Sequence, residues 1–254
     1  MDFDLPVVAD PSVDADLALL LEHRPSNISG MFDSIADHYD RLDRLLSAGL
    51  DEHWRSHLVR DLGLTGSEAV LDLCSGTGEV ALSLRRCGAA AVTAVDFAPE
   101  MLKIAESKAR NAGIDGIRFI CADALHIPLG SASVDVATMA FGLRNVEDPL
   151  AAIAEISRVL RPGGRLSILE LSRPPSVVRR IYLGYFEHVL PWVGRLLSHH
   201  RDAYRYLPAS VEAFPPPAQV AAMISAAGFE HIHVTPVSGG VAHCYSARKP
   251  KPEA

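Results

Sequence analysis

The stretch Asp72-Leu73-Cys74-Ser75-Gly76-Thr77-Gly78 decides the fold of this chain. It follows the apolar run 69–73 and precedes a helical stretch, so it marks a turn from a strand to a helix. Read from Gly76 to Ala81, the segment satisfies G-x-G-x-x-G/A, the pattern of a loop that approaches a nucleotide-like ligand. Glycine suits such a turn because a side chain would keep the backbone away from the ligand. The pattern therefore predicts an α/β protein with a ligand at this turn.

Apolar runs alternate with helical stretches on both sides of this loop. Such alternation is typical of a parallel sheet covered on both faces. We predict five strands, at 69–73, 91–95, 117–121, 134–140 and 166–171, and helices at 79–87, 99–112 and 149–160. Pro162-Gly163-Gly164 predicts a turn before the fifth strand. Two further runs, 232–237 and 241–247, flank Ser238-Gly239-Gly240 and predict an antiparallel hairpin. The expected fold is a Rossmann-like doubly wound α/β sheet, mostly parallel, with a C-terminal antiparallel hairpin.

The segments outside the sheet suggest an arm, a lid and a tail. Residues 1–30 are acidic and form an N-terminal arm with one short helix near 17–21, and residues 249–254 form a tail. The main domain is expected over 31–248, beginning with helices from Met31 and over 51–62. Residues 172–215 are expected to be a helical insertion, with an apolar face formed by Val177, Ile181, Tyr185, Val189 and Val193. That helix covers a substrate site or touches a bilayer; packing on the sheet is the equally acceptable alternative.

Composition excludes several functional classes. The net charge of −7 over 254 residues argues against broad nucleic-acid binding. The four cysteines are far apart and form no CxxC pair, so neither a disulfide framework nor a metal site is predicted. The sequence contains no apolar run long enough to span a bilayer. We expect a cytoplasmic protein, with peripheral contact at the inner face of a membrane and a homodimer both left open.

Three carboxylates select the ligand. Asp72, Asp96 and Asp123 stand at the carboxyl ends of three successive predicted strands, where ligands bind in open α/β sheets. Beside the pyrophosphate of NAD, Asp72 would be repelled by about 4 kcal/mol at 4 Å and an effective dielectric of about 20. The ammonium group of S-adenosylmethionine would instead attract it, while Asp96 accepts from ribose hydroxyls and Asp123 from the adenine amino group. Each aspartate alone could be a turn or cap residue; together they predict an S-adenosylmethionine site.

Several longer motifs carry a family resemblance, namely Phe32–Asp40, Phe141-Gly142-Leu143-Arg144-Asn145-Val146, Arg158–Gly164, Leu169–Pro174 and Tyr204-Arg205-Tyr206-Leu207. Through them the chain resembles the quinone C-methyltransferases of menaquinone and ubiquinone biosynthesis, over about residues 31–248. The resemblance implies a class I methyltransferase fold and methylation of a ring carbon of a polyprenyl quinol; naphthoquinol and benzoquinol rings both stay open. Ala140 stands where family members often have serine. With the loop, the resemblance places the cofactor on Asp72, Gly76, Thr77, Gly78, Asp96, Met101, Asp123, Ala124 and Ala140.

The chemistry requires an electron-rich ring. Removing a proton from the hydroxyl adjacent to the reacting carbon supplies the electrons, and this needs a base. We expect catalytic roles for Arg144, Tyr39 and Tyr206, with Tyr204 and the pair His199-His200 as further candidates. Arg144 cannot be a base at neutral pH but can orient a water or stabilise a phenolate. The base itself stays open. Alternative functions are an O- or N-methyltransferase, a non-catalytic binding subunit and an NAD-dependent dehydrogenase.

Overall fold

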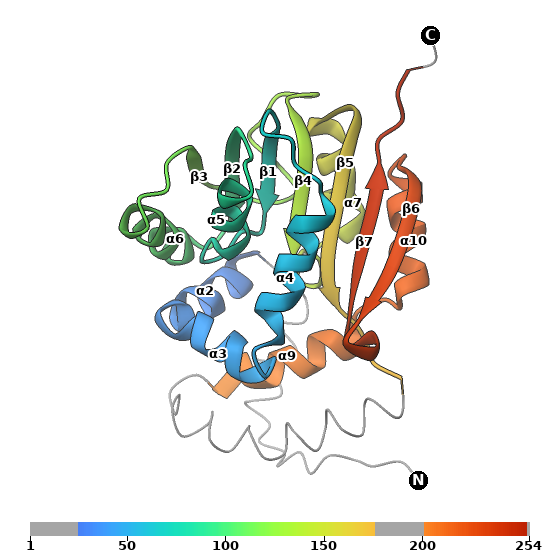
Figure 1. Ribbon diagram of the computed structural model, residues 1–254. Helices are drawn as coiled ribbons and strands as arrows, with labels where there is room; N and C mark the ends of the chain where they lie inside the picture. Colours follow the sequence, from blue (N-terminus) through green and yellow to red (C-terminus); the bar gives the residue numbers. More distant parts are fainter. Residues whose placement is uncertain (1–24, 176–200, 253–254) are drawn as a thin grey trace.

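The computed structural model describes residues 25–175 and 201–252. Within them, seven strands form one sheet in the order β3-β2-β1-β4-β5-β7-β6 (Figure 1). Strands β1 to β5 are parallel, while β7 pairs antiparallel with both β5 and β6. The predicted mostly parallel sheet with a C-terminal hairpin is confirmed. The strands are β1 (Ala69–Leu73), β2 (Ala91–Asp96), β3 (Ile117–Cys121), β4 (Val134–Ala140), β5 (Leu160–Leu171), β6 (Glu230–Val237) and β7 (Ala242–Arg248).

Helices cover both faces of the sheet. On one face lie α4 (Leu50–Asp61) and α5 (Glu79–Arg86), packed in one apolar cluster with the strands. On the other lie α7 (Pro149–Val159) and α10 (Pro217–Ala226), as Figure 1 shows. Helix α6 (Pro99–Asn111) joins β2 to β3. Burial from both sides explains why the central strands are nearly continuous apolar runs.

The Pro162-Gly163-Gly164 segment differs from its prediction. It lies inside β5, because Leu160 already pairs with Val134 and the ladder with β4 continues at Arg165 after a register shift. The Gly163 amide donates to Lys249 O, and Lys249 returns a bond to Gly164 O, both at 2.9 Å. The predicted turn is therefore a bulge within a paired strand. Local sequence could not show this, since the segment is paired with β4 and hydrogen-bonded to Lys249, neither of which is its neighbour in the sequence.

The N-terminal helical region is divided into three pieces, where a single periodic face was predicted from Met31. These are α2 (Pro25–Ile35), the 3₁₀ turn η1 (Ala36–His38) and α3 (Tyr39–Leu46). The expected boundary of the arm at residue 30 falls inside α2, where Ile28 is fully buried against Tyr206 of α9 (Arg201–Ala213). In Figure 1, α2, α3 and α9 lie below the carboxyl ends of the parallel strands. They cover the region where a ligand is expected.

Several predicted segments lie outside the described residues. They are the helix near 17–21, the insertion face at 177–193 and the pair His199-His200.

We predict that Gly78→Ala destabilises the protein strongly. Gly78 has φ +82°, and a Cβ there would lie 2.8 Å from Cβ of Ala105 on α6. The matched control Gly113→Ala shares a positive φ of +63° but meets nothing within 4 Å. In denaturant titrations, Gly78→Ala should lose about 1–3 kcal/mol more unfolding free energy than Gly113→Ala. Equal losses would mean that close helix packing does not require this glycine.

Candidate active site

The glycine loop connects β1 to α5 and is held by a carboxylate from the neighbouring strand. Gly76 N donates to Oδ2 of Asp96 at 2.8 Å, and Ser75 N donates to Val95 O at 3.1 Å. The other oxygen of Asp96 accepts from Ala98 N at 2.9 Å, at the start of α6. Cys74 has φ +54°, an uncommon conformation for a residue other than glycine and one found at functional sites. The end of β2 thus fixes the shape of the loop after β1.

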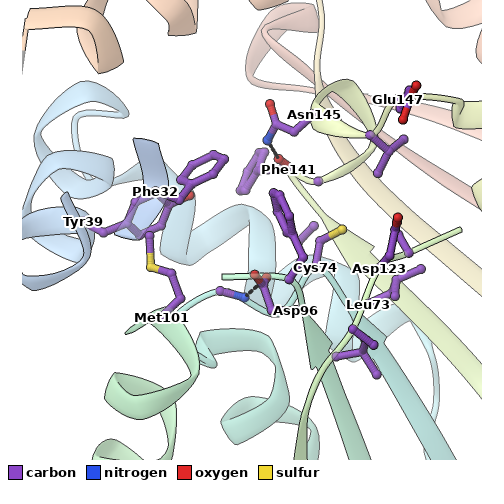
Figure 2. Close-up of a pocket in the computed structure, with 18 residues that line it drawn as sticks. Phe32, Tyr39, Leu73, Cys74, Asp96, Met101, Asp123, Phe141, Asn145 and Glu147 are labelled. Atoms are coloured by element: carbon purple, nitrogen blue, oxygen red, sulfur yellow. Dashed lines mark hydrogen bonds between the residues drawn. The ribbon is translucent and has the colours of Figure 1, made fainter. Parts of the chain in front are cut away.

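A cavity of about 680 Å³ opens beside this loop, at the carboxyl ends of β1 to β4. In Figure 2, Phe32 and Tyr39 from the N-terminal helices face Phe141 and Asn145 from the segment after β4. A Cβ on Gly76 would meet no atom within 4 Å, so the absence of a side chain leaves room for a ligand there. The predicted cofactor residues that line this cavity are Gly76, Asp96, Met101, Asp123, Ala124 and Ala140.

Asp72 and Thr77 line a smaller adjoining cavity of about 350 Å³, which shares Gly76 and Ala140 with the first. Gly78 lines neither of these two cavities and packs on α6 instead. We expected both loop glycines to face a ligand. A Cβ on Gly78 would lie 2.8 Å from Cβ of Ala105, so the missing side chain also allows the start of α5 to pack against α6.

Asp72 fits the positive end of a zwitterionic ligand. Its Oδ1 accepts from Oγ1 of Thr138 at 2.7 Å, while Oδ2 is buried without a hydrogen-bond partner among the described residues. Desolvation by burial raises the pKa of Asp72 to about 7. An orphaned buried carboxylate oxygen is costly unless a donor reaches it. The ammonium group of S-adenosylmethionine is a donor of the required charge.

The other two carboxylates lie along the same cavity. Burial raises the pKa of Asp96 to about 6, although its backbone hydrogen bonds oppose this shift. Each carboxylate oxygen has two lone pairs, so Asp96 can still accept from ligand hydroxyls. Asp123 is half-buried and accepts from Leu125 N at 2.9 Å through Oδ1. The spacing along the strand ends suits a ligand that extends from Asp72 past Asp96 to Asp123.

Polar contacts fasten α3 to the rim of the loop. Oγ1 of Thr77 donates to Oδ1 of Asp40 at 2.6 Å, and Lys108 of α6 pairs with the other oxygen of Asp40. Lys108 also pairs with Glu79 at 2.6 Å. Thr77, predicted as a cofactor residue, therefore binds the covering helix through its hydroxyl. These charges are half-exposed and lie outside the buried part of the cavity.

A second chamber of about 400 Å³ lies next to the cofactor cavity, and Tyr39 and Phe141 line both. It contains Arg144, whose Nη1 donates at 2.7 Å to Oε1 of Glu170 and to Phe141 O. The Arg144 side chain is almost fully buried, and its Nε has no partner among the described residues. Arg144 belongs to the 3₁₀ turn η2 (Leu143–Asn145), directly after β4. Its charge is thus held at the chamber wall.

The three predicted catalytic residues are placed differently. Tyr39 lies where the cavities adjoin, and burial raises its pKa far above the ordinary value. Tyr206 is buried and donates to Oδ1 of Asn145 at 2.9 Å, so it lies behind this wall residue and lines none of the three cavities. The structure brings Tyr39 and Arg144 to one chamber and gives Tyr206 a supporting position.

Sequence reasoning missed an ionic cluster on α3 and α4. Arg55 donates to Asp51 at 2.5 Å and to Asp43 at 2.6 Å, and its guanidinium lies 5.4 Å from the ring centre of Phe141. Both aspartates line the second chamber together with Trp54. One signal was present in the sequence, because Asp51 and Arg55 have the i, i+4 spacing of a helical ion pair.

Solved structures share this fold. A methyltransferase from Methanococcus maripaludis matches with a TM-score of 0.63 at 18% identity, covering 87% of this chain and 95% of that one. One from Thermotoga maritima matches with a TM-score of 0.62 at 18% identity, covering 87% and 99%. Identities this low show the fold alone. The fold, with its cavity at the strand ends, is that of a class I methyltransferase.

The chain belongs to the ubiE/COQ5 methyltransferase family, whose model matches residues 20–249. Similar curated proteins include a demethylmenaquinone methyltransferase from Thermus thermophilus, 49% identical over 202 residues, which are 78% of this chain and 91% of that protein. A ubiquinone/menaquinone biosynthesis C-methyltransferase from Syntrophotalea carbinolica is 42% identical over 235 residues, covering 91% and 98%. The predicted family is confirmed.

Among residues 25–175 and 201–252, no helix is long and apolar enough to cross a membrane.

We predict that Asp72→Asn weakens the pH dependence of stability in the ligand-free protein. The folded state holds the Asp72 proton more tightly than the unfolded chain, so unfolding free energy falls as pH rises from about 4 to about 7. Between pH 5 and pH 8 the wild type should lose about 2–3 kcal/mol more than the variant. Denaturant titrations at the two pH values measure this. Identical pH dependences would show that Asp72 is already ionised in the folded state.

Proposed function

We propose that this protein transfers the methyl group of S-adenosylmethionine to a ring carbon of a polyprenylated demethylmenaquinol. The observation that carries the proposal is the pair of adjoining chambers. The first suits the cofactor together with the smaller cavity that adjoins it, which contains the orphaned carboxylate of Asp72, and the second opens beside Tyr39 and Phe141. The names of the similar proteins from Thermus thermophilus and Syntrophotalea carbinolica support the quinol as acceptor.

The residues of the first chamber and of the smaller cavity beside it would each bind one part of the cofactor, which would supply an activated methyl group on a sulfonium. Asp72 accepts from the ammonium group, Asp96 from the ribose hydroxyls and Asp123 from the adenine amino group. Gly76 leaves room for the backbone to approach the ligand. Apolar wall positions exclude water from the remaining surface; they are Met101, Ala124 and Ala140.

The second chamber would hold the quinol ring. Its largely apolar wall excludes water from the reacting carbon, and Arg144 is positioned to stabilise negative charge on a ring oxygen. Glu170 fixes the guanidinium, so little reorganisation is needed when that charge develops. A polyprenyl tail dissolves in a bilayer, so we also propose peripheral contact with a membrane. The insertion 172–215 remains our proposed lid, although much of it lies outside the described residues.

The direct test incubates the protein with methyl-labelled S-adenosylmethionine and demethylmenaquinol under reducing conditions. We expect label in the ring-methylated quinol, identified by mass spectrometry. The oxidised quinone should not react, because its ring carbon lacks the electron density of the phenolate. Label on a ring oxygen would favour an O-methyltransferase. Cofactor binding in calorimetry with no labelled product would favour a non-catalytic binding subunit.

We predict that Asp96→Ala weakens S-adenosylmethionine binding by about 1–3 kcal/mol, because ligand hydroxyls and Gly76 N lose their acceptor. Isothermal calorimetry of the variant measures the change. Asp115→Ala, on the exposed turn before β3, is the matched control and should bind as the wild type does. An unchanged dissociation constant for Asp96→Ala would place the ribose elsewhere.

A further inference from the structure

We propose that Asp43 is the general base that accepts the hydroxyl proton of the quinol. This inference rests on the proposed function and assigns the one role in it that Arg144 and Tyr39 cannot fill. An arginine stays protonated at neutral pH. Burial raises the pKa of Tyr39 far above its ordinary value, so its phenol also holds its proton.

Asp43 lies in the chamber proposed for the acceptor ring. It lines this chamber with Tyr39, Phe141 and Arg144, two of which also line the cofactor cavity. A hydroxyl bound here would therefore lie near the carboxylate while the adjacent ring carbon faces the methyl donor. Placing base, ring and donor in this order is the arrangement that the reaction requires.

One oxygen of Asp43 is available for this role. Its Oδ2 accepts from Nη2 of Arg55 at 2.6 Å, and Oδ1 has no hydrogen-bond partner among the described residues. Asp51 lines the same chamber, but each of its oxygens already accepts one hydrogen bond, whereas Oδ1 of Asp43 accepts none among the described residues. Its Oδ1 accepts from Ser47 Oγ at 2.7 Å and its Oδ2 from Nη1 of Arg55 at 2.5 Å. Asp43 is therefore the better candidate for the base, and Asp51 positions Arg55 through its hydrogen bond.

The proton balance is complete with this single carboxylate. The quinol hydroxyl gives its proton to Asp43, and the electrons released reach the neighbouring ring carbon. That carbon forms a bond to the methyl carbon, while the sulfur–methyl bond breaks and its electron pair stays on sulfur. Asp43 then releases the hydroxyl proton to solvent, accepts the ring hydrogen as a proton, and returns that proton to the ring oxygen. One proton is released to solvent for each methyl group transferred.

The surroundings tune the basicity of Asp43. Desolvation raises its pKa and the nearby Asp51 raises it further, whereas Arg55 and Arg144 lower it, with a net shift upward. Tyr39 is the other titratable group that lines this side of the chamber. A raised pKa makes a carboxylate a stronger base, and the guanidinium of Arg55 favours its ionised form.

The test compares Asp43→Asn with the wild type on demethylmenaquinol. We expect kcat to fall by about 10²–10⁴-fold, as for loss of a general base. The wild-type rate should also fall on the acid side as Asp43 is protonated, and the variant should lack this limb. Binding is measured separately by calorimetry with 1-naphthol on protein loaded with S-adenosylhomocysteine. Its affinity should change by less than about tenfold, the size of one neutral hydrogen bond.

Two further variants make the result decisive. Asp37→Asn, on the exposed turn η1, is the matched control and should retain wild-type kcat. Asp51→Asn should lower kcat less than Asp43→Asn and keep the acid limb. Wild-type turnover with equal turnover by Asp43→Asn would overturn this inference and leave the proposed function intact. A larger loss in Asp51→Asn would also overturn it. No methylated quinol from the wild type would instead reject the proposed function.

Discussion

The carboxylate of Asp96 joins three parts of the chain, because it ends β2 and accepts from the loop after β1 and from the start of α6. Without this acceptor, the Gly76 amide would lose the bond that sets the loop's direction. The hydrogen bond between the Gly76 amide and the Asp96 side chain fixes the wall of the cavity that both residues line. Burial of the same carboxylate raises its pKa, so a structural anchor is also a group that a ligand hydroxyl can bind.

Charges gather at this end of the sheet, and several of them form ion pairs. The Arg144–Glu170 pair is almost completely buried, and such pairs contribute little net stability because desolvation offsets their attraction. Their effect is on geometry: Glu170 fixes the guanidinium at the wall of the second chamber. The positive φ of Phe141, +58°, turns the chain sharply after β4, as Cys74 does after β1. Backbone strain directly after β1 and β4, which are neighbours in the sheet, thus shapes the cavity at their ends.

The fold could be predicted from sequence because the central strands are apolar runs that alternate with helical stretches. The aspartates at 72, 96 and 123 could be recognised for the same reason, since parallel strands bring their carboxyl ends together. The bulge at Gly163 could not, because its partner Lys249 is remote in sequence. Nor could the place of Asp43, because this residue of α3 meets Arg55 of α4 only when the two helices pack together. Local patterns do not encode such tertiary contacts.

The contact between α3 and the glycine loop has a consequence for how the site is entered. Asp40 binds Thr77 and Lys108 at the rim, and both ionic partners are half-exposed to water. Attraction between such charges is screened over about 8 Å at physiological ionic strength. Dissolved salt therefore weakens the ion pair that holds α3 at this rim, while the apolar contacts of Ile28 in the neighbouring helix α2 remain. A higher salt concentration would therefore loosen the rim through which a ligand enters more than it would change the buried interior of the cavity.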